Sequence, residues 1–237
     1  MRFKFALPQA IVAATLCLPV GVAAQSRQVK DLGVGKLLVA PRNAPDPIFA
    51  KTVVLLVEFD ENGALGLLIN HPTGVPISRA LDQLKAANNH SDPVYLGGPV
   101  DVAMVLALLR ASGKPDEARR VVGDVYLVST RSLLEKTLTA GTGPGEFRAY
   151  MGYCGWGAGQ LENEMNRGGW YIFDGDAKLV FDSDPESVWS RLVARTEQKI
   201  ARRRPPAGEG WEMNLAETAA RIVYGVGRSS LNLRLAE

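Results

Sequence analysis

Cys154 and the two histidines are the residues of this sequence whose types could support nucleophilic catalysis. Cys154 lies in the stretch GYCGWGAGQLENEM, residues 152–165, directly before a predicted acidic helix. The positive end of a helix can lower the pKa of a neighbouring thiol, and the thiolate is the reactive nucleophile. Such a cysteine also needs a base, for which the chain offers His71 and His90. A thiol-dependent or hydrolytic enzyme would therefore use Cys154 with His71, which follows a predicted strand.

The alternative role for Cys154 is packing, without any chemistry. Free cysteine is among the most buried residue types, and no base lies near Cys154 in the sequence. These two points favour a protein without catalytic residues and keep the enzyme as the alternative. Two cysteines and two histidines are also too few and too scattered for a zinc site. We expect neither a metal nor a cofactor.

The glycines around Cys154 predict a tight turn and a candidate binding site. Glycine allows a positive φ or the close approach of another segment. Backbone N–H groups that enter the helix at residues 158–161 would form a concave anion-binding surface. A ligand site here would comprise Gly155, Trp156, Gly157, Gly159, Gln160 and Glu162. The commoner interpretation of such a stretch is that Trp156 fills the core and the glycines let the chain bend.

Other polar residues near this stretch have local roles as their first interpretation. Glu162 and Glu164 are two residues apart, so on a helix they diverge and cannot act as a carboxylate pair. Glu162 near the helix start would instead stabilise the helix dipole. Asp46, Asn70 and Gln160 could line the rim of a site. Such residues are more often hydrogen-bonding partners in turns and caps.

The elements that must position these residues begin with a predicted β-hairpin. Residues 52–59 (TVVLLVEF) are rich in β-branched residues and almost continuously apolar, as in a strand buried on both faces. The Asn62-Gly63 step is a strong hairpin signal, and residues 64–70 return as the partner strand. A short apolar strand at residues 36–40 precedes this hairpin.

The middle of the chain predicts alternating strands and helices. Ser132 with Glu135 three residues later predicts a capping box at a helix start, and Gly141 fits the end of that helix. The periodicity at residues 102–109 fits either element, and the turn signals around it favour a strand. The predicted elements are helices at 78–87 and from Ser132, and strands at 102–109, 124–129 and 147–153.

The last part of the predicted domain contains a hairpin and a long helix. Residues 170–174 and 179–181 form the hairpin across Asp174-Gly175-Asp176. Pro185 suits the first position of a helix. The apolar face of that helix is expected to consist of Val188, Trp189 and Leu192. The basic run Arg202–Arg204 is too short to indicate nucleic-acid binding.

The first 24 residues have the three-part pattern of a secretory signal peptide. Arg2 and Lys4 precede an apolar run at 11–18, and small residues at 22–24 predict cleavage after Ala24. The apolar run is shorter than the roughly 20 residues of a membrane span. We therefore expect a periplasmic or secreted mature chain without a transmembrane span. The alternative is an uncleaved segment and a cytoplasmic protein.

Length and composition predict one globular domain with an extension. The chain has 237 residues, of which 46% are hydrophobic and 22% charged. After the signal peptide at 1–24, the domain is expected at 25–199, followed by a basic linker and C-terminal extension at 200–237. Cleavage would leave 25 basic and 25 acidic side chains. A neutral mature protein is not attracted to nucleic acid, so no nucleic-acid partner is expected after export.

Three segments together resemble the YqgE/AlgH family of small bacterial proteins. They are GKLLVAPRNAPDPIFAKTVVLLVEFDENGALGLLINHP at 35–72, YLGGPV at 95–100, and the stretch at 152–165. The resemblance spans roughly residues 35–192. It implies an α+β domain whose bent, mostly antiparallel sheet curls toward a barrel-like shape, with helices packed outside. It also implies no established catalytic activity, and one namesake is linked to regulation of alginate production.

The chain departs from the family pattern at several positions. Phe59 stands where a histidine is common, and Cys154 stands where a small residue is usual. Family members are usually cytosolic, whereas this chain begins with a predicted export signal. The sequence therefore predicts an exported, non-catalytic protein that binds a partner protein or a small ligand near the glycine stretch. A cytosolic regulatory protein is the alternative.

Overall fold

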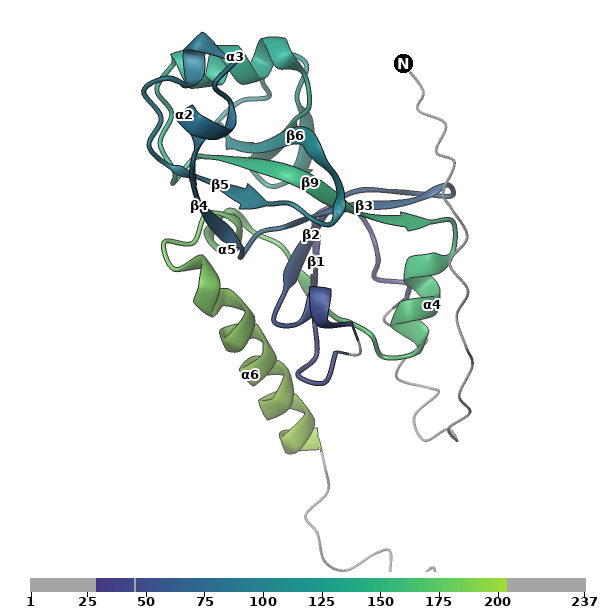
Figure 1. Cartoon of the computed structure of the whole chain (residues 1–237). Coiled ribbons are helices and arrows are strands. Elements are labelled where there is room, and N and C mark those ends of the chain that lie inside the picture. The colour runs from purple at the N-terminus through teal and green to yellow at the C-terminus, as the bar shows by residue number, and fades with distance from the viewer. Residues whose placement is uncertain (1–28, 45, 204–237) are drawn as a thin grey trace, which may run out of the picture. The chain divides into compact units, whose positions relative to one another are not determined.

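The computed structural model describes residues 29–44 and 46–203 (Figure 1). The predicted signal peptide and residues 204–237 lie outside the described residues, so both remain predictions. The chain divides into two units, of which the first ends at Thr196 and the second begins at Glu197. The following description concerns the first unit.

One half of the sheet is built from antiparallel neighbours in the order β10-β1-β2-β3-β9. These strands are β1 (Lys36–Val39), β2 (Val53–Asp60), β3 (Gly63–Leu68), β9 (Phe147–Gly157) and β10 (Tyr171–Asp174). The β2–β3 hairpin is the one that the Asn62-Gly63 step predicts. Side chains of β2 alternate between two apolar clusters, which confirms a strand buried on both faces.

The other half of the sheet shares β9 and adds five strands. β6 (Val100–Arg110) pairs with β9 and continues to β8 (Val125–Val128) and β7 (Arg119–Val122), all antiparallel. β5 (Pro93–Leu96) lies parallel to β9 and antiparallel to β4 (Pro72–Pro76). The result is a curled, mostly antiparallel half-barrel with helices outside it, so the predicted α+β fold class is confirmed (Figure 1).

The helices divide the apolar core into three clusters. One cluster lies on a single face of both halves of the sheet and is covered by α5 and α6. On the opposite face, α2 and α3 cover the β6–β8–β9 region, and α4 covers β1, β2 and β3. The helices are α2 (Ile77–Ala80), α3 (Arg131–Thr139), α4 (Gln160–Asn166), α5 (Ala177–Val180) and α6 (Pro185–Arg203), with 3-10 turns η1 (Pro47–Phe49) and η2 (Lys85–Ala87).

The continuous helix predicted at 78–87 is wrong. The structure has the short α2, a turn, and then the 3-10 turn η2. The buried residues Leu81, Leu84 and Ala87 recur every three residues, which is the period of a 3-10 helix rather than an α-helix. The loop at residues 90–92 also accepts the backbone N–H groups of Ile77 and Ser78, which fixes the start of α2.

The hairpin predicted from residues 170–174 and 179–181 is also wrong. β10 does form, but it pairs with β1, which lies about 135 positions earlier in the chain. Residues 177–180 form the helix α5 instead. The Asp176 side chain accepts a hydrogen bond from Leu179 N (2.8 Å), so a local cap stabilises the helix over the predicted strand.

The N-cap of α3 lies two residues before Ser132, the N-cap of the predicted capping box. Thr130 is the N-cap, and its side chain accepts from Leu133 N. The Ser132 hydroxyl instead donates to the Glu117 carboxylate, and Glu135 pairs with Arg131. The capping box is therefore wrong. The predicted strands at 102–109 and 124–129 are confirmed within β6 and β8, and α6 begins at Pro185 as predicted.

Candidate functional site

Most of the glycine stretch is strand, which corrects the predicted turn. β9 continues through Gly155 to Gly157 and stays in register with β3. Within the stretch only Gly152 and Gly159 have a left-handed φ, of 73° and 72°. The turn itself is confined to Ala158 and Gly159, before α4. The free edge of β3 supplies backbone partners for residues 154–157, so the chain stays extended there.

Trp156 is part of the core rather than an exposed ligand contact. It is 6% exposed and packs in the cluster beneath α4. Its Nε1 donates to Glu164 Oε2 at 3.0 Å, and Trp170 Nε1 donates to the same oxygen at 2.9 Å. The two indole rings meet edge to face, with centroids 6.2 Å apart. One carboxylate of α4 therefore ties two tryptophans together.

The Gln160 side chain at the start of α4 forms hydrogen bonds with neighbouring groups of the protein. Gln160 Oε1 accepts from Gly157 N at 3.2 Å, and Gln160 Nε2 donates to Glu164 Oε1 at 3.1 Å. Gly159 is the N-cap and provides no side-chain hydrogen bond. Glu162 lies in the first turn, where its charge favours the helix dipole as expected. The acidic surroundings disfavour an anion at this short helix.

Cys154 is buried, and its thiol is not activated. The side chain is 1% exposed, and Sγ donates to Gly97 O at 3.6 Å. Burial raises the pKa of the Cys154 thiol to about 12. α4 begins only after the strand segment Gly155–Gly157. The positive end of this helix does not offset the effect of burial on the pKa of Cys154. A protonated, buried thiol is a poor nucleophile.

The structure does not join Cys154 with either histidine. Burial lowers the pKa of His71, against the opposing effects of a hydrogen bond to the backbone of Lys51 and the charge of Glu186. His71 is thus associated with the loop before β2 and the start of α6. His90 is buried, and its Nε2 lies 2.8 Å from Leu138 O, which links it to the end of α3.

The side chains of Asp46 and Asn70 form hydrogen bonds with backbone groups, as their residue types favour. Asp46 caps the turn η1 by accepting from Ile48 N at 2.9 Å. Asn70 is buried; its Oδ1 accepts from Val53 N at 2.8 Å, and its Nδ2 donates to Lys51 O at 2.9 Å.

The second and third sequence segments pack against each other through glycine backbone. A Cβ on Gly97 would lie 2.1 Å from Gly152 O, and one on Gly98 would lie 2.1 Å from the Tyr153 carbonyl carbon. A Cβ on Gly152 would lie 2.5 Å from Gly98 O. The segment that follows β5, at Gly97 and Gly98, therefore crosses β9 at a distance that only glycine permits. Sequence reasoning missed this contact because 55 positions separate Gly97 from Gly152.

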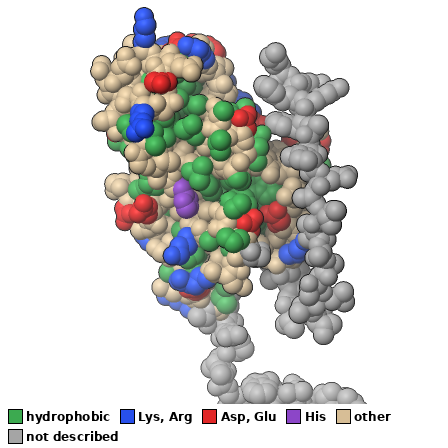
Figure 2. Space-filling model, in the orientation of Figure 1, with side chains coloured by type: hydrophobic (Ala, Val, Ile, Leu, Met, Phe, Trp, Pro, Cys, Tyr) green, Lys and Arg blue, Asp and Glu red, His purple; other side chains and the backbone are tan. Residues whose placement is uncertain are grey.

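An exposed, partly apolar surface borders this crossing. β6 bulges between Val100 and Val105, where its register with β9 shifts. Val102 on the bulge is 56% exposed, Leu96 at the end of β5 is 39% exposed, and Gly155 is exposed on β9. On the face in Figure 2, hydrophobic side chains gather near the middle, where β3, β6 and β9 meet in Figure 1. We define Leu96, Val100, Val102, Gly155 and Gly157 as the glycine-strand surface.

Two further properties concern only residues 29–44 and 46–203. No helix in this part of the chain is long and apolar enough to cross a membrane. Within the same residues, no group of three or more His, Cys, Asp or Glu side chains could hold a metal ion.

The fold and the glycine crossing define an α+β half-barrel domain, and comparison with known proteins gives its family. A family model described as AlgH-like matches residues 37–201. A UPF0301 protein of Streptomyces avermitilis is 36% identical over 176 residues, covering 70% of this chain and 88% of its own. One from Paraburkholderia phymatum is 35% identical over 164 residues, covering 67% and 85%. The chain belongs to the AlgH-like family.

Solved structures agree with this assignment. The solution structure of the AlgH protein from Pseudomonas aeruginosa matches with a TM-score of 0.57 and 31% identity, covering 74% of this chain and 95% of that one. The crystal structure of DIP2367 from Corynebacterium diphtheriae matches with a TM-score of 0.54 at 20% identity, which supports the fold alone. The resemblance inferred from the three sequence segments is therefore confirmed.

Proposed function

We propose that this protein is a non-catalytic binding protein that docks a partner protein on the glycine-strand surface. The observation that carries the proposal is the end of β9, where Gly155 and Gly157 present backbone without side chains, while Trp156 between them and Cys154 before them are buried. Exposed Val102 lies on the bulge of β6, which pairs with this strand through Val100 and Tyr153. Apolar side chains around accessible backbone suit close contact with another protein.

The geometry of the predicted catalytic pair supports a binding role over an enzymatic one. Cys154 is inaccessible, and burial holds its pKa high. Burial lowers the pKa of His71, whose ring has a hydrogen bond with the backbone of Lys51 and lies near the charge of Glu186. Of the residues predicted to bind a ligand, Trp156 is buried in the cluster beneath α4, whereas Gly155, Gly159 and Gln160 are exposed.

Photo-crosslinking in the native host tests the docking surface. A benzophenone amino acid placed at Val102 is expected to give one reproducible adduct. The same probe at Ile48, which is 60% exposed on η1, is the matched control. A second change, Leu96→Asp, should remove the Val102 adduct while leaving the melting temperature unchanged. Equal adducts from both positions, or none from Val102, would contradict the proposal.

We also propose that the protein is exported and cleaved after Ala24. The support is the order of Arg2 and Lys4, the apolar run at 11–18 and the small residues at 22–24. Intact-mass analysis of the protein from its native host gives the result directly. A mature chain that begins at Gln25 is expected. A mass that includes residues 1–24 would instead support the cytoplasmic regulatory protein.

A further inference from the structure

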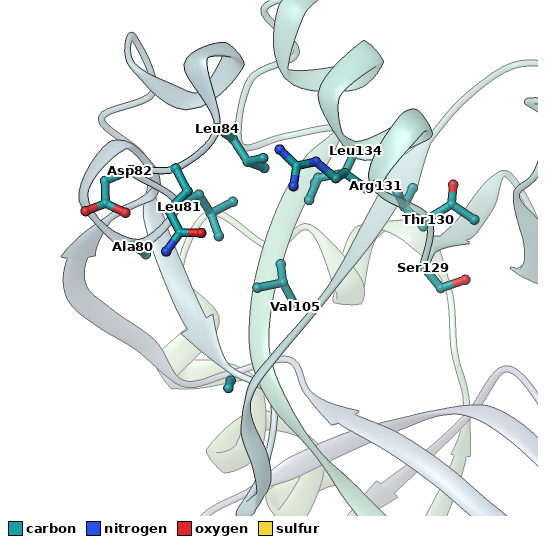
Figure 3. A pocket seen from close by; sticks show the side chains of 12 residues that line it. Ala80, Leu81, Asp82, Leu84, Val105, Ser129, Thr130, Arg131 and Leu134 are labelled. Atoms are coloured by element: carbon teal, nitrogen blue, oxygen red, sulfur yellow. The ribbon is translucent and has the colours of Figure 1, made fainter. Parts of the chain in front are cut away.

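A cavity of about 420 Å³ adjoins the glycine-strand surface, because Ala103 in its wall directly follows Val102 on β6 (Figure 3). The cavity lies between β6, the segment that follows α2, and the part of the chain that leads from β8 into α3. Its volume falls within the range of about 300–1,000 Å³ that is usual for binding pockets. The docking surface and the cavity therefore lie next to each other along one strand.

At this cavity, β6 loses its neighbour β8. The last pair between the two strands is Ala107 with Val128. The chain then leaves the sheet at Ser129 and Thr130 and begins α3. Both of these residues and Val105 of β6 line the cavity, which therefore occupies the gap between β6 and the departing chain. A strand edge without a neighbour is a template for pairing with another chain.

The backbone of Val105 is directed toward this gap. Ala111 N donates to Asp124 O, on the β8 side of β6, and Arg110 N donates to Glu146 O, on the β9 side. These directions alternate along an antiparallel strand, and the register of β6 with β9 is constant as far as Val105. Odd-numbered residues of this part of β6 thus face the β8 side. In the described part of the chain, the Val105 N–H and C=O have no hydrogen-bonding partner there.

The wall of the cavity is apolar on the face of the sheet beneath α2 and α3. Leu81, Leu84 and Leu134 belong to the cluster on this face. The Val105 side chain packs against the same cluster. In an antiparallel pair, residues directly opposite each other place their side chains on the same face. A peptide residue that bonds to the Val105 backbone would therefore direct its own side chain into the cavity.

We propose that this site binds an extended segment of the partner protein, which adds to β6 as an antiparallel strand beside Val105. One residue of the segment exchanges both backbone hydrogen bonds with Val105 and places an apolar side chain in the cavity. The backbone bonds give affinity, and the cavity selects the side chain. The inference rests on the proposed function for the source of the segment, because Val102 of the docking surface and Ala103 of the cavity wall are consecutive.

Blocked pentapeptides test the strand addition on the isotopically labelled full chain. Acetyl-Ser-Val-Leu-Val-Ser-amide and its analogues with central valine or phenylalanine are the probes. At least one is expected to give saturable NMR shifts at amides that line the cavity. Hydrogen exchange of the Val105 amide should slow on binding, because the peptide supplies its acceptor. The amide of Leu106 faces β9 and is the internal control.

Single N-methyl groups distinguish strand pairing from apolar contact. Methylation of the central nitrogen removes the donor that faces β6 and should weaken binding about tenfold or more, or about 1.4 kcal/mol. Methylation of the following valine alters a nitrogen that faces away from β6, so this matched peptide should bind as the parent does. Aspartate at the centre should also weaken binding at least about tenfold, because its charge would leave water for an apolar wall.

Two variants of the protein locate the peptide. Ala103→Trp fills the cavity from an exposed position on β6 and should abolish peptide binding. Ala140→Trp adds the same ring at an exposed position after α3 that does not line the cavity, and it should leave binding unchanged. Melting curves establish that both variants are folded. If Ala103→Trp does not fold, the pair of N-methyl peptides decides the result alone.

The proposal is overturned if none of the unmethylated peptides gives saturable shifts, or if methylation at the two positions has equal effects. A Val102 adduct together with either result would keep the docking surface and remove only the strand addition. The expected pattern of peptide binding without a Val102 adduct would contradict the docking surface and keep the strand site. The two proposals can therefore fail separately.

Discussion

At the scale of single residues, burial decides the chemistry of Cys154. The thiol is enclosed by the cluster beneath α4 and donates to Gly97 O. Charged thiolate is poorly solvated there, and the pKa of Cys154 rises from 9.0 to about 12. The folded protein therefore keeps the proton over a pH range in which the unfolded chain releases it.

The raised pKa predicts an alkaline loss of stability that depends on Cys154. Below pH 9 the contribution of the protonated thiol is fully present, and it is lost as the pH rises from 9 toward 12. The loss amounts to about 1.4 kcal/mol per pH unit, and about 4 kcal/mol in total. Urea melts between pH 8 and 10.5 should show a steeper decline for the wild type than for Cys154→Ala.

Both proteins in this comparison carry Cys17→Ser, so that Cys154 is the sole thiol. At neutral pH, Cys154→Ala should cost about 1 kcal/mol or less, and a thiol electrophile should label Cys154 slowly. Rapid labelling at pH 7 would show a thiolate and favour the enzyme, whereas parallel pH profiles would show that burial does not raise the pKa of Cys154.

Trp156 is the residue on which the packing beneath α4 depends. Trp156→Ala should destabilise the protein by about 3–5 kcal/mol because a large buried ring is lost. Trp156→Phe keeps part of the ring and loses the hydrogen bond to Glu164, so its cost should be clearly smaller. Chemical denaturation of the two variants measures both values. A melt of Trp156→Ala equal to that of the wild type would place the ring outside the core.

At the scale of elements, Gly152 lets β9 serve both halves of the sheet. Before it, Tyr150 faces the cluster beneath α5 and α6, and Ala149 faces the cluster beneath α3. After it, Tyr153 faces the α5–α6 cluster, and Cys154 faces the cluster beneath α4. The alternation of side chains thus shifts by one residue at Gly152. A left-handed φ of 73° at this position makes the shift possible.

Gly152→Ala should therefore destabilise the protein by about 2–5 kcal/mol. A non-glycine residue in the left-handed region costs about 1–2 kcal/mol, and crowding against Gly98 O adds about 1–3 kcal/mol. The control is Gly143→Ala, because a Cβ there meets nothing within 4 Å. Gly143→Ala should lie within about 0.5 kcal/mol of the wild type. Thermal melts of both variants that coincide would refute the close crossing.

At the scale of the whole molecule, α5 and α6 close one face of the sheet. Arg148 of β9 is buried and donates to Val180 O at 2.8 Å and also to Asp182 O. Trp189 Nε1 donates to Ala40 O at 2.8 Å, after β1. These bonds hold the C-terminal helices against both halves of the sheet. The last buried core residue of α6 is Val193.

The position of Val193 predicts where the chain can be shortened. A chain cut after Thr196, the end of the first unit, should keep its free energy of unfolding within about 1 kcal/mol. A chain cut after Asp184 loses the burial of Val188, Trp189, Leu192 and Val193. At about 1.5–3 kcal/mol each, this loss is comparable with the stability of a whole domain. Circular dichroism melts distinguish the two; a large loss after the Thr196 cut would give residues 197–237 a structural role.

The sequence by itself determines the features that depend on neighbouring residues. The Asn62-Gly63 step and the apolar runs beside it predict the β2–β3 hairpin, since its partners are adjacent in the chain. Pro185 predicts the start of α6, and the helical period predicts the burial of Val188, Trp189 and Leu192. The three family segments are also local patterns, and they predict the half-barrel correctly.

Only the tertiary structure decides the pairings between distant segments. The strand propensity of residues 170–174 is the same whether they pair with residues 179–181 or with β1. In the structure they pair with the free edge of β1. In the sequence, the glycines at 97–98 and 152 indicate turns. In the structure, the chain crosses β9 directly after β5, and this crossing brings their backbones together. The sequence around Glu164 does not indicate that its carboxylate accepts hydrogen bonds from two indole groups. The ring of Trp170 reaches Glu164 only after the chain turns back past α4. Local propensity sets an element's type, whereas the packing of remote surfaces sets its partners.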